Sequence, residues 1–505
     1  MNRNILAVKY RDMEVGRIYW DDRSRRAVFE YAPDFATKGI QLAPLSAPVS
    51  EKTTLPVVGN REKIFQGLPP FIADSLPDRW GNLVFQQWAA QERIPKKSIS
   101  PVDKLAFIGK RAMGALEFEP ASHQMPVQNR LKLDSLYQTA RKIFEGRGEA
   151  KVLPGEELSL QALYQVGTSA GGQHPKAILA IDDETGEIRS GQVMHEPCFR
   201  YYILKFAEKS DFPFTEIEYV WYRLAQLSGI DIMPSRLMEA DGERHFLTER
   251  FDRRGGRKIH IQTLAAMMPE AESYEDLFET ARRLGLPYSQ IEQLFTRTVF
   301  NFLSGNVDDH IKNFSFMMDD DGTWSITPAY DVTFTTDLSA SAYDNGHSMS
   351  LLGKTECITE EDLLEFARLN GIRDAASIIE RVCKAVMKFR HESEAVGISR
   401  YWIEKIANHL AGLLPDRYSE TVDSKHPAHI DAYTTEDGIE VSNARIVETA
   451  KHDYHILADI EGRQYKFVIG HKRPLASEIS SQGGIFIPES TLKELVEEFI
   501  VPKAK

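Results

Sequence analysis

The pattern of apolar and polar positions predicts that the chain begins with strands. Apolar and polar residues alternate over three short runs separated by turns, as they do in half-buried β-strands. These runs are Ile5 to Tyr10, Val15 to Trp20 and Ala27 to Tyr31. A helix from Pro77 to Ala90 is predicted next, because Pro77 and Asp78 suit a first helical turn. With a turn and strand over Gly109 to Phe118, these elements form a predicted β-rich subdomain of residues 1–120.

Strands and helices alternate in the following part, residues 121–255. Residues 121–155 have the Pro, Gly and charged residues of a connector, with one helix at Asp134 to Glu145. Beyond the connector, the predicted strands are Ala177 to Asp182, Tyr201 to Phe206 and His245 to Phe251, and the predicted helices are Glu157 to Gln165 and Glu216 to Ser228. We expect these elements to form one antiparallel lobe.

Residues 256–417 are predicted to be mostly helical apart from one hairpin. The hairpin pairs Phe314 to Met318 with Thr323 to Thr327 across an Asp-rich turn. The helix before it is expected to open with a capping box of Ser289 and Glu292 and to end at Gly305. A strand-rich lobe followed by a helical lobe favours a bilobed α+β architecture.

The composition changes after about residue 417, where a polar segment is typical of a linker. Residues 430–505 are then predicted to form a small appended α+β domain, since about 75 residues suffice for one. Its predicted elements are strands at Tyr454 to Ile460, Tyr465 to Ile469 and Gly484 to Ile487 and a helix at Thr491 to Phe499.

Composition narrows the class of protein. At 505 residues the chain is long enough for roughly three domains. The apolar runs are too short for a membrane span, and the first residues lack a signal-peptide core, so we expect a cytoplasmic protein without a membrane partner. Three scattered cysteines without a CxxC motif argue against a disulfide framework or a zinc site and fit a reducing cytosol. A net charge of −13 disfavours a primary DNA binder.

The segment around the hairpin carries the most informative chemistry. Asp308 and Asn313 stand in a D-x-x-x-x-N spacing, and a second acid, Asp331, follows the hairpin. Phosphoryl transfer from ATP needs a carboxylate to orient the acceptor hydroxyl, and an amide and a carboxylate to hold magnesium. The spacing matches the catalytic loop of protein kinases, although the usual His-Arg is missing. Taken alone, the motif is also compatible with a solvated Asp-rich turn.

Other segments fit a phosphate site. A loop of small residues, Gly167 to Lys176, could place backbone N–H groups close to phosphates, although a plain turn explains it too. Lys205 lies in an apolar strand and could pair with Glu218 of the next helix, or it could be an edge lysine that reaches water. The glycine loop, the strand with Lys205, the helix with Glu218 and the loop with Asp308 and Asn313 (the acidic loop) follow one another in the order found in kinases.

Five motifs together make the chain resemble the HipA family of bacterial type II toxin Ser/Thr protein kinases. They are Ser75 to Asp78, Gly167 to Gln173, Glu249 to Arg253, Asp308 to Phe314 and Pro328 to Asp331. The resemblance covers about residues 5–415 and implies a bilobed protein-kinase-like fold with a small N-terminal β-rich subdomain. It also implies ATP and Mg2+ as cofactors, a helix-turn-helix antitoxin (HipB-like) that binds operator DNA, and a protein substrate such as an aminoacyl-tRNA synthetase.

Site roles follow from the resemblance on matching positions. Asp308 is expected to be the catalytic base, and Asn313 and Asp331 to be metal ligands. Thr168 or Ser169 is expected to be autophosphorylated, and the loop around them to bind phosphates. The other nucleotide-binding residues expected are Gly171, Gly172, Gln173, Lys205, Glu218, Glu249, Phe251, His310 and Tyr330.

Two other functions are compatible with the same site residues. One is a kinase that phosphorylates a small molecule. The other is a non-catalytic co-repressor that binds nucleotide and acts with a DNA-binding antitoxin. Two intact acids at 308 and 331 favour an enzyme over the co-repressor.

Overall fold

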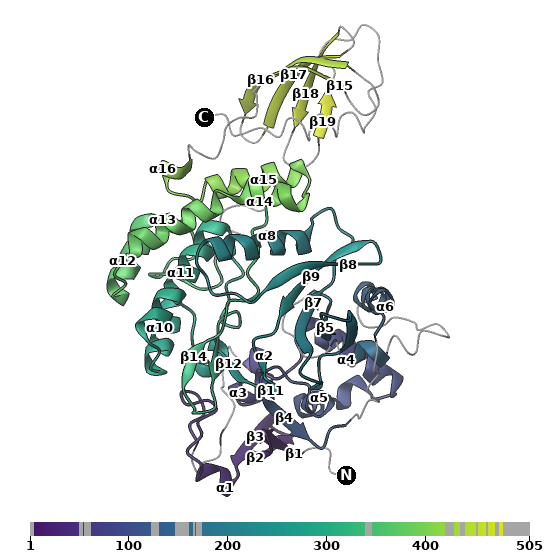
Figure 1. The fold of residues 1–505 in the computed structure, drawn as a ribbon, viewed down its shortest axis with the longest axis vertical. Coiled ribbons are helices and arrows are strands. Elements are labelled where there is room, and N and C mark those ends of the chain that lie inside the picture. The colour runs from purple at the N-terminus through teal and green to yellow at the C-terminus, as the bar shows by residue number, and fades with distance from the viewer. Residues whose placement is uncertain are drawn as a thin grey trace.

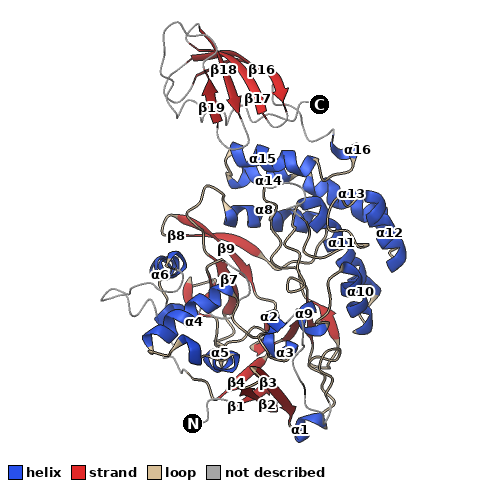
Figure 2. Ribbon diagram, turned by 180° about the vertical axis from the view of Figure 1, so that it is seen from behind, coloured by secondary structure: helices blue, strands red, loops and turns tan. Residues whose placement is uncertain are grey.

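A computed structural model shows how the chain folds. It describes residues 5–49, 54, 62–122, 131–146, 161–164, 167, 174–338, 346–419, 429–434, 440–450, 453–460, 463–469 and 474–477. Figures 1 and 2 show the chain from opposite sides, with an N-terminal sheet at one end and a C-terminal sheet at the other. Among the described residues, no helix is both long and apolar enough to cross a bilayer.

The N-terminal sheet confirms the predicted strands. Its order is β3-β2-β1-β4, with antiparallel neighbours. Leu6, Val8 and Tyr10 alternate into the core, which explains the period of two in the sequence. The elements of this part are β1 (Ile5–Tyr10), β2 (Met13–Asp21), β3 (Arg26–Tyr31), β4 (Leu116–Glu119), α1 (Pro33–Ala36), α2 (Glu62–Phe65), α3 (Pro70–Ala73), η1 (Lys96–Ser98) and α5 (Pro101–Ile108).

Helix α4 (Arg79–Gln91) follows α3 in the chain, but its apolar side chains pack on the second sheet, which is described below. Its N-cap is Asp78, which accepts a hydrogen bond from Gly81 N at 2.7 Å. Such a cap satisfies one of the free N–H groups at a helix start. Pro77 therefore lies just outside the helix that the sequence predicts to begin there.

The second sheet has the order β6-β5-β7-β9-β8. Helices α4 and α6 pack against one face of it, and α8 packs on the other, as Figures 1 and 2 show. The predicted strands and the Glu216 to Ser228 helix are present, whereas the edge strands β6 and β8 were not predicted. The elements are α6 (Leu133–Glu145), β5 (Lys176–Asp182), β6 (Glu187–Ser190), β7 (Phe199–Lys205), α8 (Phe214–Leu227), β8 (Ser235–Ala240) and β9 (Glu243–Glu249). Of the predicted helix 157–165, the structure describes residues 161–164, which are helical.

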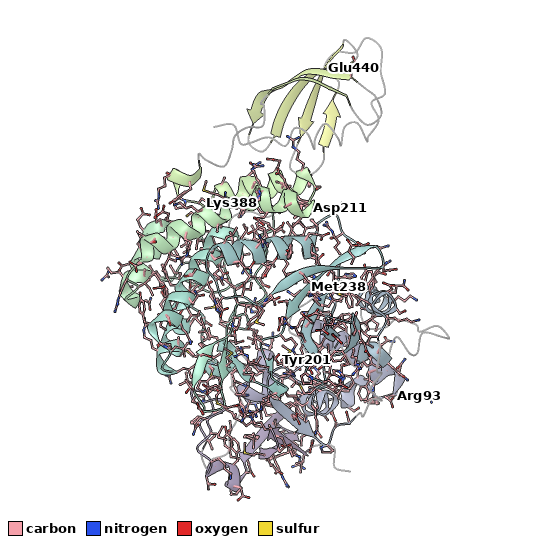
Figure 3. The ribbon with its side chains drawn as sticks, viewed as in Figure 1. Arg93, Tyr201, Asp211, Met238, Lys388 and Glu440 are labelled. Carbon is pink, nitrogen blue, oxygen red and sulfur yellow. The ribbon has the colours of Figure 1, made fainter. Side chains whose placement is uncertain are left out.

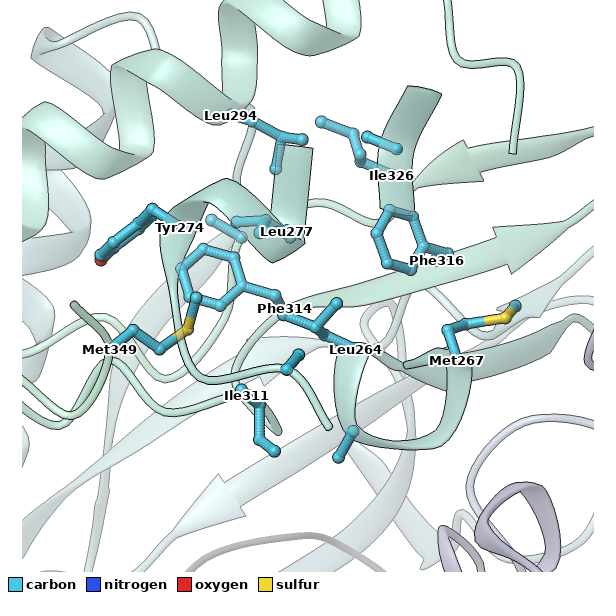
Figure 4. Close-up of a cluster of buried hydrophobic side chains, with 14 of the residues drawn as sticks. Leu264, Met267, Tyr274, Leu277, Leu294, Ile311, Phe314, Phe316, Ile326 and Met349 are labelled. Atoms are coloured by element: carbon cyan, nitrogen blue, oxygen red, sulfur yellow. The ribbon is translucent and has the colours of Figure 1, made fainter. Parts of the chain in front are cut away.

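The third part is mostly helical. Its hairpin, β13 (Ser315–Met318) with β14 (Trp324–Ile326), confirms the prediction, and β12 (His260–Thr263) adds an unpredicted strand beside β13. Apolar side chains from the hairpin, α9, α10 and α11 form one cluster (Figure 4). The remaining elements are β10 (Arg253–Arg254), β11 (Arg257–Lys258), α9 (Leu264–Met267), α10 (Tyr274–Arg283), α11 (Tyr288–Ser304), α12 (Glu360–Asn370), α13 (Ala375–Val386), α14 (Phe389–Val396), α15 (Arg400–Ala411) and α16 (Asp416–Ser419).

The predicted start of α11 was wrong. The helix begins directly after Pro287, whose carbonyl accepts hydrogen bonds from Gln290 and Ile291, and its N-cap has no side-chain hydrogen bond. Ser289 and Glu292 thus lie inside the helix and form no capping box. The predicted end is confirmed, because Gly305 adopts the left-handed conformation of a C-cap glycine, with φ of 69°.

The C-terminal sheet is antiparallel, with strands in sequence order. Two of its strands confirm the prediction, and three were missed. The strands are β15 (His429–Thr434), β16 (Glu440–Ala450), β17 (Asp453–Ile460), β18 (Arg463–Ile469) and β19 (Pro474–Ser477). The predicted strand at 484–487 and helix at 491–499 lie outside the described residues.

Candidate active site

The predicted pairing of Lys205 with Glu218 is confirmed. Lys205 Nζ lies 2.6 Å from Glu218 Oε1 and also donates a hydrogen bond to Asp331 Oδ1. Since β7 lies between β5 and β9, Lys205 is not an edge lysine. Burial alone would lower the pKa of Lys205, but the carboxylates of Asp331 and Glu218 raise it above its ordinary value. A permanently charged lysine is therefore fixed between two acids.

Asp331, which follows the hairpin in the chain, contacts Lys205 of the second sheet. Burial would raise the pKa of Asp331, but Lys205 and Lys176 hold it below its ordinary range. Its backbone is left-handed, with φ of 53°. Such a conformation costs free energy for a non-glycine residue. The sequence gives no signal for this strained backbone.

A second lysine lies beside this cluster and was missed as a site residue. Lys176 pairs with Lys205 across β5 and β7, is 2% exposed, and has its Nζ 3.7 Å from Asp78 Oδ2. Burial lowers the pKa of Lys176 although Asp78 opposes this, and burial raises the pKa of Asp78 to about 6 although Lys176 opposes it. Trp80 Nε1 donates to the carbonyl of Lys176 at 2.9 Å, so the start of α4 is fixed to the start of β5.

Asp308 lies in the loop that follows α11. Its side chain is 53% exposed, and Nε2 of His310 lies 3.9 Å from its Oδ1. Partial burial raises the pKa of Asp308, the nearby His310 lowers it, and Asp331 raises it further. An accessible carboxylate with a raised pKa is suited to accept a proton.

Asn313 is fixed on the same loop. Its amide Nδ2 donates to the carbonyl of Asp308 at 2.8 Å, which leaves its amide oxygen as the group that can bind a cation. Asn313 and Asp331 line one pocket, with Tyr330, Phe314, Arg297 and Asn306 among its other walls. Carboxylate and amide oxygens are hard ligands of the kind that Mg2+ prefers. The two residues therefore fit the metal that the resemblance implies.

Phe251 and Tyr330, two of the residues expected to bind the nucleotide, are also close together. The ring centroids of Phe251 and Tyr330 are 5.8 Å apart, and Tyr330 donates to the carbonyl of Lys312 at 2.7 Å. Glu249 is the last residue of β9. The next residue, Arg250, donates its backbone N–H at 2.8 Å to the carbonyl of Tyr201, which is labelled in Figure 3. The structure thus brings Phe251 and Tyr330 beside the Asp331 side of the site.

The glycine loop is the part of the expected site that the structure does not describe. Thr168, Ser169, Gly171, Gly172 and Gln173 lie outside the described residues. The loop's end is described: His174 pairs with Glu208 through Nδ1 and packs its ring 5.2 Å from that of Phe214, the first residue of α8.

Comparisons with known proteins identify the family and the fold of the chain. The model of the HipA N-terminal domain matches residues 6–119, and that of the HipA-like C-terminal domain matches residues 168–389, together more than half of the chain. The chain belongs to the HipA family. HipA from Shewanella oneidensis MR-1, solved with HipB and operator DNA, has the same fold at a TM-score of 0.57 and 18% identity, over 82% of this chain and 96% of that one. The predicted α+β, kinase-like fold is thereby confirmed.

Two curated bacterial proteins are also similar to this chain. The Sinorhizobium fredii protein named "Putative kinase Y4mE" is 26% identical over 79% of this chain and 97% of that protein. A Haemophilus influenzae protein, also named as a kinase, is 26% identical over 41% of this chain and 62% of its own length.

Proposed function

We propose that this HipA-family protein is an ATP-dependent serine/threonine protein kinase and the toxin of a type II toxin–antitoxin module. The observation that carries the proposal is the convergence of distant segments on one charged site. Lys205 of β7, Glu218 of α8 and Asp331 beyond the hairpin are in direct contact, and Asn313 lines a pocket with Asp331. The names of the curated relatives support a kinase as well.

Each side chain has a role in phosphoryl transfer, a reaction that is catalysed mainly by positioning and electrostatic stabilisation. Asn313 and Asp331 would hold Mg2+, which supplies charge neutralisation on the phosphates. Lys205, oriented by Glu218, would bind the phosphates. Asp308 would accept the proton of a serine or threonine hydroxyl as that oxygen bonds to the γ-phosphorus and ADP leaves.

The remaining nucleotide contacts are assigned by the resemblance. Residues 249–251, His310 and Tyr330 would surround the nucleoside, and Gly171, Gly172 and Gln173 would approach the phosphates. Thr168 or Ser169 would accept a phosphoryl group from the same site. Phosphorylation adds about −1.5 to −2 charges, so it would repel bound phosphates and inactivate the enzyme.

The partner proposed is a HipB-like helix-turn-helix antitoxin that binds operator DNA. The solved Shewanella complex of HipA, HipB and operator DNA supports this choice. A net charge of −13 also fits a protein that reaches DNA through its partner.

The cellular location proposed is the cytoplasm. The free thiols at Cys198 and Cys357 are exposed, which agrees with reducing conditions there.

The decisive experiment adds radiolabelled ATP and Mg2+ to a lysate with wild-type protein or the Asp308→Asn variant. Asp308 is half-exposed, so the isosteric change should spare folding while lowering transfer by about 100-fold or more, as expected for a lost catalytic base. Asp321→Asn, in the exposed hairpin turn, is the matched control and should leave labelling unchanged. Mass spectrometry of the labelled bands then identifies the substrate, expected to be a translation component such as an aminoacyl-tRNA synthetase, and any phosphate on Thr168 or Ser169.

Other outcomes select the alternatives. Label that appears on small molecules and on no protein would identify a small-molecule kinase. Binding of ATP without turnover, in a protein that still joins its antitoxin, would identify a co-repressor. Equal labelling by wild type and Asp308→Asn would exclude Asp308 as the base.

A further inference from the structure

Two neighbouring acids of the acidic loop have opposite surroundings. The side chain of Asp308 is half-exposed, whereas Asp309 is 1% exposed. The buried carboxylate of Asp309 accepts three hydrogen bonds, from the Tyr274 hydroxyl, from His347 Nδ1 at 2.8 Å and from Ser348 N at 2.8 Å. A buried carboxylate stays charged at low cost only with such donors. Asp309 therefore borders the pocket of Asn313 and Asp331 with both carboxylate oxygens already hydrogen-bonded to the protein.

Further hydrogen bonds extend this network to α11. Asn301 of α11 donates to the Tyr274 hydroxyl at 3.0 Å, and Asn306 donates to Asn301 Oδ1 at 2.9 Å. The imidazole of His347 also packs on Phe302, with ring centroids 4.1 Å apart. Residues from α10, α11, the acidic loop and the segment after Asp331 thus form one buried polar cluster.

The same distant segment also fixes the backbone on the other side of Asp308. Thr335 Oγ1 accepts hydrogen bonds from the N–H groups of Val307 at 2.8 Å and Asp308 at 3.0 Å. Ser348 donates to the carbonyl of Val307 through its N–H at 3.0 Å and its hydroxyl at 3.1 Å. Thr335 thus fixes the backbone on the N-terminal side of Asp308, and the hydrogen bonds of Asp309 fix it on the C-terminal side.

Apolar packing completes the support. Figure 4 shows Ile311 and Phe314, which flank the end of the acidic loop, within the same buried cluster as Tyr274 and Met349. In this view the hydroxyl of Tyr274 points away from the apolar side chains. Tyr274 thus contributes its ring to the core and its hydroxyl to Asp309.

We infer that Asp309, His347 and Tyr274 are positioning residues that place Asp308 for proton transfer. The inference rests on the proposed function, since it gives a reason for the network only if Asp308 is the base. Asp309 lines the same pocket as Asn313 and Asp331. Among the described residues, however, the hydrogen bonds of Asp309, His347 and Tyr274 go to one another and to neighbours of Asp308, and not to Lys205, Asn313 or Asp331, so we assign the network to the base. A displacement of about 1 Å in a catalytic group can cost roughly 100-fold in rate.

The test uses the full chain and measures initial rates of radiolabel incorporation into lysate protein as the ATP concentration varies. His347→Leu and Tyr274→Phe each remove one donor to Asp309, whereas His347→Asn keeps an N–H near the position of Nδ1. We expect the maximal rate to fall by about 10- to 100-fold in the first two variants and to stay within about threefold of wild type in His347→Asn. The KM for ATP and the binding of a non-hydrolysable ATP analogue should change less than about twofold, because the variants remove no hydrogen bond of Lys205, Asn313 or Asp331.

Controls separate positioning from stability. His391→Leu replaces a histidine whose side chain is 78% exposed and should change neither rate nor melting temperature. If His347→Leu does not fold, Tyr274→Phe decides, since it removes one oxygen only. Maximal rates within twofold of wild type in the folded variants would overturn the inference, as would a parallel loss of rate and analogue binding. A wild-type protein that transfers no phosphate would overturn the proposed function itself, and the inference with it.

Discussion

At the scale of single residues, burial sets the charge of two histidines that lie away from the site. His245 and His260 are fully enclosed, at 0% and 1% exposure. Burial lowers the pKa of each from 6.5 to about 4, although the backbone of Ala240 beside His245 and that of Leu42 beside His260 oppose the shift. His245 Nδ1 accepts from Ala207 N at 3.0 Å, and Leu42 O lies 2.7 Å from His260 Nε2. Both side chains are therefore neutral in the folded protein at neutral pH.

These histidines predict acid sensitivity. Between pH 6.5 and 4 the unfolded chain binds protons at both histidines that the folded chain does not bind, so the free energy of unfolding decreases as the pH falls through this window. Each histidine accounts for about 3 kcal/mol of this loss. Urea denaturation of wild type and His260→Asn at several pH values measures it. The variant should show a weaker pH dependence, His391→Asn should match wild type, and equal slopes in all three would contradict the prediction.

Residues of the site differ in how far the sequence reveals them. Asp308, Asn313 and Asp331 stand in a recognisable spacing, and Lys205 is conspicuous as a charge in an apolar strand. Lys176 and Asp309 gave no such signal, because their partners come from remote parts of the chain. Asp78 was expected in the first turn of a helix and is its N-cap, and nothing in the sequence marked it as the partner of Lys176. Local patterns predict what a residue can do, whereas its burial and partners depend on the tertiary fold.

At the scale of elements, the junction between α11 and the acidic loop depends on Gly305. This residue ends the helix with φ of 69°, and an added Cβ would lie 2.9 Å from side-chain atoms of both Phe334 and Thr336. Thr336 donates its hydroxyl to the carbonyl of Gly305 at 2.9 Å. Glycine is required here for its conformation and for the space it leaves.

Gly305→Ala should therefore destabilise more than a glycine change at a comparable helix end. Gly371 ends α12 with φ of 71° and has no neighbour within 4 Å of an added Cβ, so it is the matched control. We expect about 1–2 kcal/mol for Gly371→Ala from the left-handed backbone alone. Gly305→Ala should cost a further 1–3 kcal/mol or so from overpacking. Urea midpoints measure both, and equal losses would show that the neighbours yield freely.

Elements were predictable where their pattern was strong. β1, β5 and β7 alternate or bury long apolar runs, and the helix end at Gly305 has its expected residue. β8 was missed because its side chains are mostly half-exposed and its sequence has no clear alternation. The start of α11 was misplaced because Ser289 and Glu292 have capping-box spacing, whereas Pro287 already begins the helix. In each miss, pairing or backbone geometry outweighed the local side-chain pattern.

At the scale of the whole molecule, one buried ionic cluster ties the N-terminal part to the lobes. Asp252 is paired with Arg250 through two hydrogen bonds of 2.8 Å and with Arg253 at 2.8 Å, and all three are nearly inaccessible. It also accepts from Gly114 N, while Arg253 donates to the carbonyls of Ala112 and Gly114. Burial would raise the pKa of Asp252, but the two arginines lower it below its ordinary range.

Removing the charge of Asp252 should destabilise the whole protein. Asp252→Asn leaves two buried guanidinium groups without their counter-charge, and breaking a buried pair costs about 3–5 kcal/mol. Asp320→Asn is the control, because Asp320 also pairs with two arginines, Arg257 at 2.9 Å and Arg11 of the N-terminal part, but lies on the surface and is 51% exposed. Surface pairs are worth about 0–1 kcal/mol. Thermal unfolding of both variants tests the difference, and similar melting temperatures would argue against a linking role for Asp252.

The packing of α4 and α5 has a consequence for how this protein could evolve. Trp80 and Val84 of α4 and Phe107 of α5 share a core with Leu179 of β5 and Leu204 of β7. The helices belong to the first family module and the strands to the second. Joining the first module of a distant relative to the second module of this chain would change the side-chain volumes of that shared interior and is therefore expected to lower the stability of the hybrid.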